Sequence, residues 1–327
     1  MKDFVIEVKG LKTQFKADEG LVTAVDGVDF NLSAKETLAI VGESGSGKSV
    51  TALSILRLIQ EPPGKIAAGE ILYLGQDLLR MSNKKMRGIR GNEISMIFQE
   101  PMTSLNPVFT VGQQINEVIM IHQKLNKKEA AKKSVELIKL VGIPNPEKCF
   151  KNYPHQLSGG MRQRIMIAIA LACNPKVLIA DEPTTALDVT IQSQILKLMQ
   201  ELKEKLDTAI ILITHDLGVV AQLAENIMVM YAGKAVEYGD TLSIFEKPLH
   251  PYTEGLLNSI PKINEEHERL QIIRGTVPSP FNLPEGCKFS TRCDYVMDIC
   301  KKEPEYITLE NNRKVRCWKY IGVGDNE

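Results

Sequence analysis

Apolar positions recur along the chain with two different periods, and these periods predict a mixed α/β fold. Runs of β-type residues at 4–6 and 38–41 predict a small antiparallel layer that leads into a buried strand. The apolar run 177–180 ends in Asp181, as is typical of a buried parallel strand. Further strands are expected at 94–98, 209–214 and 227–231, and helices at 50–60, within 111–142, at 191–206 and at 217–224. Strands that alternate with helices indicate an α/β core with a parallel sheet.

The amino-acid composition of the chain changes near residue 240, and we expect an appended segment to begin there. Six prolines lie between residues 248 and 284, and four of the six cysteines follow residue 286. We therefore divide the chain into a main domain over 1–240 and an appended segment over 241–327. The appended segment is expected to have its own organising principle and little hydrophobic core of its own.

Composition excludes several classes of protein. The 327 residues are 43% hydrophobic and 24% charged, which is ordinary for a globular protein and allows two or three lobes. Forty basic and 40 acidic residues cancel, which argues against attachment to nucleic acid or anionic lipid by long-range charge. The longest apolar run, 165–173, is far shorter than the roughly 20 residues of a membrane span. With no signal-peptide pattern at the start, we expect a cytosolic chain in which disulfides are disfavoured.

Residues 42–49, GESGSGKS, match a phosphate-binding loop at every fixed position. The predicted strand before it and the predicted helix after it are the context that this loop requires. Its glycines let the backbone N–H groups wrap a phosphate, and the helix N-terminus adds partial positive charge. Lys48 is expected to reach the β- and γ-phosphates, and Ser49 to offer its hydroxyl to Mg²⁺. The expected ATP-binding residues here are Gly42, Ser44, Gly45, Ser46, Gly47, Lys48, Ser49 and Val50.

An acidic pair follows the buried strand at 177–180. Asp181 lies at the C-terminal end of that strand, where the ligands of open α/β sheets gather, and is the expected metal-side carboxylate. Glu182 is the next residue and is placed to orient or deprotonate an attacking water. Alone, an Asp-Glu pair would indicate only a solvated turn; together with the phosphate loop it indicates nucleotide hydrolysis.

Residues 157–164, LSGGMRQR, resemble the LSGGQ signature of the ATP-binding subunits of ABC transporters, with Met161 in place of Gln. Ser158 is a suitable N-cap, and Gly159 and Gly160 precede an apolar helix over 161–173, so the motif predicts an exposed anion-binding helix end. The resemblance implies that two such subunits face each other head to tail. Each signature then closes the ATP site of its partner.

Other landmarks of this family match in order. Gln99 in IFQEP resembles the glutamine that binds metal and water, Asp188 ends a TALD loop, and His215 in ITHD resembles the histidine near the γ-phosphate. Phe15 is the candidate for the ring that stacks on adenine. The resemblance implies a P-loop (RecA-like) ABC ATPase core with an antiparallel β subdomain, an α-helical subdomain over about 100–170 and a small metal-stapled C-terminal extension.

The segment after His215 narrows the resemblance. Residues 250–253 (HPYT), 275–280 (GTVPSP) and 283–287 (LPEGC) resemble the C-terminal extension of the oligopeptide/dipeptide permease ATPases. This implies an ATPase on the cytoplasmic face of the membrane that powers import of short peptides. The implied partners are a second ATPase subunit, identical or paralogous, two transmembrane permease subunits and, indirectly, an extracytoplasmic peptide-binding protein.

Cys287, Cys293, Cys300 and Cys317 are spaced more widely than the pairs of a typical structural zinc site. Four thiolates in a reducing compartment can still hold a soft metal centre. The family resemblance implies a [4Fe-4S] cluster on these four cysteines, while Zn²⁺ and unligated thiols stay open as alternatives. Cys173 is expected to be a buried small hydrophobe, and Cys149 has no predicted role.

Three other functions stay open at this stage. An importer ATPase of the same subfamily could carry another cargo, such as nickel or a sugar oligomer, because cargo is chosen by other subunits. A nucleic-acid-associated ABC ATPase is disfavoured, since one module is present and no heptad run separates its motifs. A P-loop kinase or GTPase is disfavoured, because neither class uses the Ser-Gly-Gly helix or the histidine of ITHD.

Overall fold

The computed structural model describes residues 4–99, 104–184, 188–259 and 273–321. The chain divides into two compact units. Unit 1 comprises residues 1–5, 32–36 and 80–213, and unit 2 comprises residues 6–31, 37–79 and 214–327. The fold is α/β, as predicted, and each unit is described below by itself.

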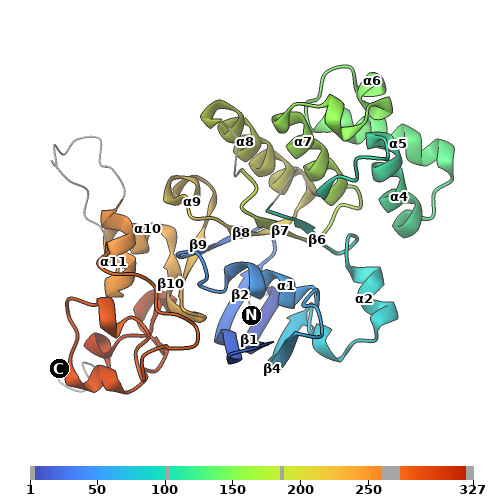
Figure 1. Cartoon of the computed structure of the whole chain (residues 1–327). Helices are drawn as coiled ribbons and strands as arrows, with labels where there is room; N and C mark the ends of the chain where they lie inside the picture. The colour runs from blue at the N-terminus through green and yellow to red at the C-terminus, as the bar shows by residue number, and fades with distance from the viewer. Residues whose placement is uncertain (1–3, 100–103, 185–187, 260–272, 322–327) are drawn as a thin grey trace. The chain divides into compact units, whose positions relative to one another are not determined.

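The N-terminal part of unit 2 is a four-stranded sheet in the order β2-β1-β4-β5. Its strands are β1 (Phe4–Ala17), β2 (Gly20–Ser33), β4 (Gly64–Tyr73) and β5 (Gln76–Asp77), and the larger three lie side by side in Figure 1. β1 runs antiparallel to β4, with Ile6 opposite Tyr73. The antiparallel layer was predicted from short apolar runs, but β1 and β2 are each 14 residues long, and β4 was not predicted. The middle of β4 is Ala67, Ala68 and Gly69, residue types that are depleted in strands, so the sequence does not mark it as a strand.

A second set of strands in unit 2 has the order β11-β12-β10-β9-β3. They are β3 (Thr37–Val41), β9 (Asn226–Tyr231), β10 (Lys234–Asp240), β11 (Ile307–Thr308) and β12 (Lys314–Val315). β3 and β9 are parallel, and the others pair antiparallel. All five residues of β3 are buried, as expected for a central strand.

Helix α1 (Lys48–Ile55) follows β3 and is shorter than the predicted 50–60 helix. The difference has a local cause, because Arg57 adopts a left-handed backbone conformation with φ 50°. The N–H of Leu58 then donates to the carbonyl of Leu53, which closes the helix in a Schellman arrangement. Unit 2 also contains α9 (Leu217–Leu223), α10 (Thr241–Glu246) and α11 (Pro251–Asn258).

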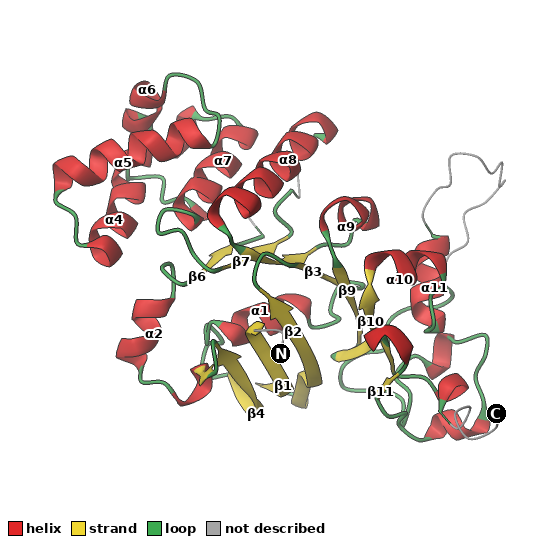
Figure 2. Cartoon of the chain, turned by 180° about the vertical axis from the view of Figure 1, so that it is seen from behind, coloured by secondary structure: helices red, strands yellow, loops and turns green. Residues whose placement is uncertain are grey.

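Unit 1 contains three parallel strands in the order β8-β7-β6, namely β6 (Ile94–Ile97), β7 (Val177–Asp181) and β8 (Ala209–Ile213). All three strands were predicted, and every residue of β7 and β8 is buried. The helices of this unit are α2 (Asn83–Ile89), α4 (Val111–Gln123), α5 (Lys127–Leu140), α6 (Pro146–Lys151), α7 (Gly159–Ala170) and α8 (Val189–Leu206). Helices α4 to α7 pack against one another (Figure 2).

The C-terminal segment packs against earlier strands of unit 2 and shares a hydrophobic cluster with them. Tyr252 of α11 and Phe289 pack in the same hydrophobic cluster as Val41 of β3 and Tyr231 of β9. Strand β12 also extends the sheet by pairing with β10. Part of this burial is against β3, which lies far earlier in the chain, and local sequence patterns cannot reveal such a contact.

Candidate functional site

The phosphate loop, residues 42–49, connects β3 to α1, as predicted. Gly42, Gly45 and Gly47 have φ of 151°, 77° and 100°, a region that other residues rarely adopt. A Cβ atom on Gly42 would lie 2.1 Å from the carbonyl oxygen of Met230, and one on Gly47 would lie 2.4 Å from that of Ala24. These two glycines therefore let the loop pass directly against neighbouring backbone.

Lys48 begins helix α1, and its side chain folds back over the loop. Its Nζ donates to the carbonyl oxygens of Gly42 (2.7 Å) and Glu43 (2.9 Å) and lies 3.4 Å from Oγ of Ser46. The N-cap is Gly47, which has no side chain to satisfy the first N–H groups of the helix. A buried ammonium beside an uncapped helix N-terminus is suited to bind an anionic phosphate.

The other predicted loop residues differ in exposure. Ser44 and Gly45 are exposed at the tip, whereas Ser49 and Val50 are half-buried in the first turn of α1. Phe15, the predicted adenine-stacking residue, is half-buried on β1 opposite Gly64 of β4. A Cβ on Gly64 would lie 2.8 Å from a ring carbon of Phe15, so the ring packs close to this strand.

In unit 1, the acidic pair and Gln99 come together at the ends of adjacent strands. Asp181 is the buried last residue of β7, and Glu182 follows it with a left-handed φ of 48°. The N–H of Glu182 donates to the carbonyl oxygen of Ile213 on β8 (2.8 Å). Nε2 of Gln99, which follows β6, donates to Oε2 of Glu182 (2.9 Å). The carboxylate of Glu182 is thus aimed by contacts from both neighbouring strands.

These donors suit the metal that the sequence predicts. Ser49, Gln99 and Asp181 offer hydroxyl, amide and carboxylate oxygens, which are the ligand types that Mg²⁺ prefers. Ser49 lies in unit 2, and the other two lie in unit 1.

Three further predicted residues lie at the starts of helices. Ser158 is the N-cap of α7, where its Oγ accepts from the N–H of Met161, and Gly159 and Gly160 form the first turn. The helix therefore begins two residues before the predicted 161. Asp188 is the N-cap of α8, while residues 185–187 of the same motif lie outside the described residues. His215 is exposed and immediately precedes Asp216, the N-cap of α9.

The four C-terminal cysteines line one cavity together with His250 and Trp318. Burial, together with the proximity of the other three thiols, raises the pKa of Cys287 to about 11, and burial also raises the pKa of Cys293 and of Cys317. Among the described residues, no group of three or more Cys, His, Asp or Glu has the arrangement of a metal site. Four thiols around one cavity nevertheless form a donor set that suits a soft metal.

The two remaining cysteines lie in unit 1. Cys149 is buried in α6, and burial raises the pKa of its thiol. Cys173 was predicted to be buried at the end of a helix, but it is only half-buried. Helix α7 ends at Ala170, so the residue falls in the turn that follows the helix.

Sequence reasoning missed the residues that contact the phosphate loop from the C-terminal segment. The guanidinium of Arg292 pairs with the carboxylate of Glu43, with Nη1–Oε2 at 2.7 Å and Nη2–Oε1 at 3.1 Å. The hydroxyl oxygen of Tyr252 accepts from the backbone N–H of Glu43 at 2.8 Å. Glu43 occupies a variable position of the loop motif, so no local signal marked it.

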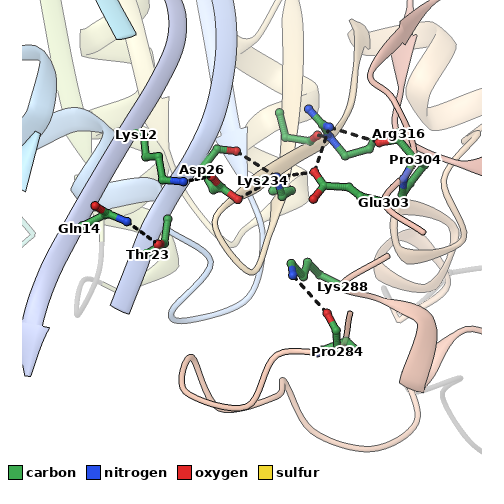
Figure 3. A network of polar contacts seen from close by, with 11 residues as sticks. Lys12, Gln14, Thr23, Asp26, Lys234, Pro284, Lys288, Glu303, Pro304 and Arg316 are labelled. Atoms are coloured by element: carbon green, nitrogen blue, oxygen red, sulfur yellow. Dashed lines mark hydrogen bonds and ion pairs between the residues drawn. The ribbon is translucent and has the colours of Figure 1, made fainter. Parts of the chain in front are cut away.

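A chain of ion pairs also links the N-terminal sheet to the C-terminal segment within unit 2 (Figure 3). Nζ of Lys234, which is nearly buried, contacts the carboxylates of Asp26 at 2.8 Å and Glu303 at 2.5 Å. Lys12 pairs with the other oxygen of Asp26, and Arg316 lies 3.5 Å from Glu303. Although burial raises the pKa of Asp26, the hydrogen bonds and charges of Lys234 and Lys12 outweigh burial and leave that pKa lowered.

Comparison with known families gives two matches. Residues 25–185 match the family described as ABC transporter, and residues 236–300 match the one described as oligopeptide/dipeptide transporter, C-terminal region. The oligopeptide transport ATP-binding protein AppD of Bacillus subtilis is 56% identical over 98% of both chains. The dipeptide transport ATP-binding protein DppD of the same organism is 52% identical over 96% of this chain and 94% of its own.

Solved structures share the fold of about three quarters of the chain. A dimeric ATP-binding cassette in a post-hydrolysis state, bound to ADP and Pi, matches with a TM-score of 0.65 and 27% identity over 72% of this chain and 98% of its own. The cbiO1 protein of Clostridium perfringens, part of an ABC transporter complex, matches with a TM-score of 0.63 and 31% identity over 75% and 92%. In the part of the chain that the structure describes, no helix is long and apolar enough to span a membrane.

Proposed function

Because this chain belongs to the ATP-binding subunits of ABC transporters that carry the oligopeptide/dipeptide C-terminal region, we propose that it hydrolyses ATP to power import of short peptides. The observation that carries the proposal is the end-to-end match to peptide-transport ATP-binding proteins, which includes the C-terminal region as well as the cassette. A match to the cassette alone would support ATP hydrolysis but would not indicate which class of cargo is transported.

In the proposed reaction, ATP lies in the loop of residues 42–50, with its phosphates at the N-terminus of α1. Lys48 exchanges its contacts with the loop carbonyls for the β- and γ-phosphates, and the loop N–H groups bind the remaining phosphate oxygens. Mg²⁺, when bound by Ser49, Gln99 and Asp181, neutralises charge on the phosphates. Phe15 is proposed to stack on the adenine.

Glu182 acts as the general base on the attacking water. Its carboxylate is held by Gln99, and its backbone is held by β8, so its direction is set before the substrate arrives. His215 stabilises the γ-phosphate as charge redistributes towards the leaving group. These roles assign proton transfer to Glu182 and charge stabilisation to Lys48 and His215.

The exposed start of α7 is proposed to complete the ATP site of a second subunit. Ser158 and the two following glycines offer a helix end with free space around it, as Ser158 and Gly159 are exposed. Asp188 would lie at the same subunit interface. The dimeric state of the similar solved cassettes supports a pair of subunits, and we propose that the pair is head to tail, with a partner that is identical or a paralogue.

The likeness to peptide-transport proteins also defines the proposed location and remaining partners. The subunit binds two transmembrane permease subunits on the cytoplasmic face of the membrane, through the region near Gln99 and the helices of unit 1. The complex receives peptides from an extracytoplasmic binding protein. The names of the relatives favour peptides over nickel or sugar oligomers as cargo.

We propose that Cys287, Cys293, Cys300 and Cys317 hold a [4Fe-4S] cluster, with Zn²⁺ as the alternative. Their shared cavity and soft donor atoms support this, and bound metal would offset the raised pKa values by stabilising the thiolates. Purification without oxygen, followed by visible absorption and analysis of iron, sulfide and zinc, tests the assignment. A colourless protein without iron would exclude the cluster, and absence of zinc as well would leave four free thiols.

Reconstitution tests the function as a whole. The chain is combined with candidate permease subunits, a partner ATPase and a peptide-binding protein in vesicles. We expect ATP hydrolysis that rises when the binding protein is loaded with peptide, together with uptake of labelled peptide. If ATP hydrolysis responded to Ni²⁺ or oligosaccharide instead of peptide, the proposed cargo would be wrong. The assignment as an ATPase would remain.

A further inference from the structure

The C-terminal segment reaches the phosphate loop through one loop residue, Glu43. Its carboxylate makes the bidentate pair with Arg292, and its backbone N–H donates to Tyr252. Its carbonyl oxygen accepts from Nζ of Lys48 at 2.9 Å and from the N–H of Ser46 at 3.2 Å. Glu43 is therefore bound on one side to the C-terminal segment and on the other to the lysine that is expected to contact ATP.

Arg292 is itself held in place. Its side chain is 5% exposed, and its Nε donates to the carbonyl oxygen of Arg274 at 2.9 Å. The guanidinium lies near the rings of Tyr231 and Phe289, with centroids at 5.8 Å and 5.9 Å. A planar guanidinium fixed by packing and by carbonyl contacts orients the carboxylate it pairs with.

Tyr252 is equally constrained. Its side chain is fully buried, and its ring packs against Tyr231 at 4.7 Å and Phe289 at 5.4 Å between centroids. Its N–H donates to Nδ1 of His250, the N-cap of α11. The hydroxyl oxygen that accepts from Glu43 is thus attached to a rigid aromatic cluster.

The pair has an electrostatic consequence as well as a geometric one. Glu43 places a carboxylate on the loop that is expected to bind a highly anionic ligand, and Arg292 supplies the opposite charge at hydrogen-bonding distance. If Arg292 were removed, the uncompensated carboxylate would repel phosphate groups. Removal of both charges would abolish that repulsion.

We propose that Arg292 and Tyr252 are positioning residues of the ATP site, which orient Glu43 and thereby the phosphate loop and Lys48. The inference rests on the proposed ATP-binding function of this loop. It makes the C-terminal segment a working part of its own subunit's nucleotide site. Arg292 directly precedes Cys293. A rearrangement of the cysteine-bearing turn would therefore also displace the phosphate loop, through the ion pair between Arg292 and Glu43.

Nucleotide affinity of the purified full-length chain tests the proposal. Equilibrium dissociation constants of a fluorescent ATP analogue are measured for wild type, Arg292→Met, Glu43→Gln and the double variant. We expect Arg292→Met to weaken binding about tenfold, and the double variant to return to within about threefold of wild type. Arg274→Met is the matched control, because that side chain is 84% exposed and belongs to the same segment.

Conservative variants separate positioning from folding. Arg292→Lys keeps the charge but loses the bidentate geometry, and Tyr252→Phe removes only the acceptor of the Glu43 N–H. Both are expected to keep a melting temperature close to wild type and to raise KM for ATP more than they lower kcat. The proposal is overturned if Arg292→Met and Tyr252→Phe bind nucleotide as tightly as Arg274→Met, or if the double variant binds no better than Arg292→Met. Absence of nucleotide binding in the wild type would instead refute the proposed function.

Discussion

The side-chain amide of Gln99 donates a 2.9 Å hydrogen bond to the carboxylate of Glu182. The two residues follow the adjacent parallel strands β6 and β7, and Glu182 has a left-handed backbone conformation at that point. A non-glycine residue with φ 48° is uncommon, and such conformations concentrate at functional sites. The contact gives the proposed general base a defined direction.

Replacing Glu182 with Gln removes the proton acceptor and keeps the size of the side chain. We expect steady-state ATP hydrolysis to fall by about 10²–10⁴-fold, because general-base catalysis contributes that much, while ATP still binds. Phosphate release from the assembled transporter measures the rate. Glu201→Gln, on the exposed side of α8, is the control with the same chemical change. Wild-type hydrolysis by Glu182→Gln would show that another group activates the water.

The phosphate loop offers a matched pair of glycine substitutions. Both Gly45 and Gly47 have positive φ, but a Cβ on Gly45 meets nothing within 4 Å, whereas one on Gly47 would lie 2.4 Å from a backbone oxygen. We expect Gly45→Ala to lower the free energy of unfolding by about 1 kcal/mol, from backbone strain alone. Gly47→Ala should cost about 3 kcal/mol, since the clash is added. Urea unfolding of both variants measures this, and equal losses would mean that the loop relaxes at Gly47.

The sequence predicted those parts of the fold that are encoded locally. Strands β6 to β9 are buried apolar runs bounded by turns, and the phosphate loop and its flanking elements follow from one motif. It did not predict β4, whose middle is the weak strand former Ala-Ala-Gly, or the end of α1 at Ile55, which depends on the left-handed conformation of Arg57. The end of α1 is set by a single left-handed backbone conformation, which is uncommon for an arginine and which the residue type does not signal.

The candidate site was predictable in its residue types but not in its connections. Gln99 and Glu182 were identified separately, whereas their contact depends on the pairing of β6 with β7. Arg292 could not be identified, because it lies 249 positions from Glu43 and carries no motif of its own. Contacts over such separations are created by the topology of the chain, and one sequence contains no pattern for them.

The lowered pKa of Asp26 predicts a dependence of stability on pH. Because its folded pKa lies below the ordinary value of about 3.9, ionised Asp26 stabilises the folded state above that value, and the contribution is lost as pH falls through the folded pKa. The side chain is 29% exposed, so we expect less than about 1 kcal/mol. Free energies of unfolding for wild type and Asp26→Asn, compared between pH 3 and 7, should differ most near neutrality and converge in acid. A constant difference would contradict the role of Lys234 and Lys12.

Glu237 provides a test of how firmly the C-terminal segment is attached. This carboxylate on β10 is fully buried, and it accepts from the backbone N–H groups of Leu249 (2.9 Å) and His250 (2.8 Å). Its counter-charge is Arg313, whose Nη2 lies 2.9 Å from Oε1 and also donates to the carbonyl oxygen of Lys247 at 2.7 Å. Glu237 therefore joins β10 to the chain before Cys287, through the N–H groups, and to the chain between Cys300 and Cys317, through Arg313.

Removal of Arg313 leaves the carboxylate of Glu237 buried with no compensating charge. We expect Arg313→Met to lower the free energy of unfolding by about 3–5 kcal/mol, the range observed when one partner of a buried pair is lost. Glu237→Gln combined with Arg313→Met should lose less, because no charge is then buried. Arg274→Met, which breaks an exposed pair with Asp294, should cost less than about 0.5 kcal/mol. If Arg313→Met cost no more than Arg274→Met, water would have to reach Glu237, and the segment would be held by apolar packing alone.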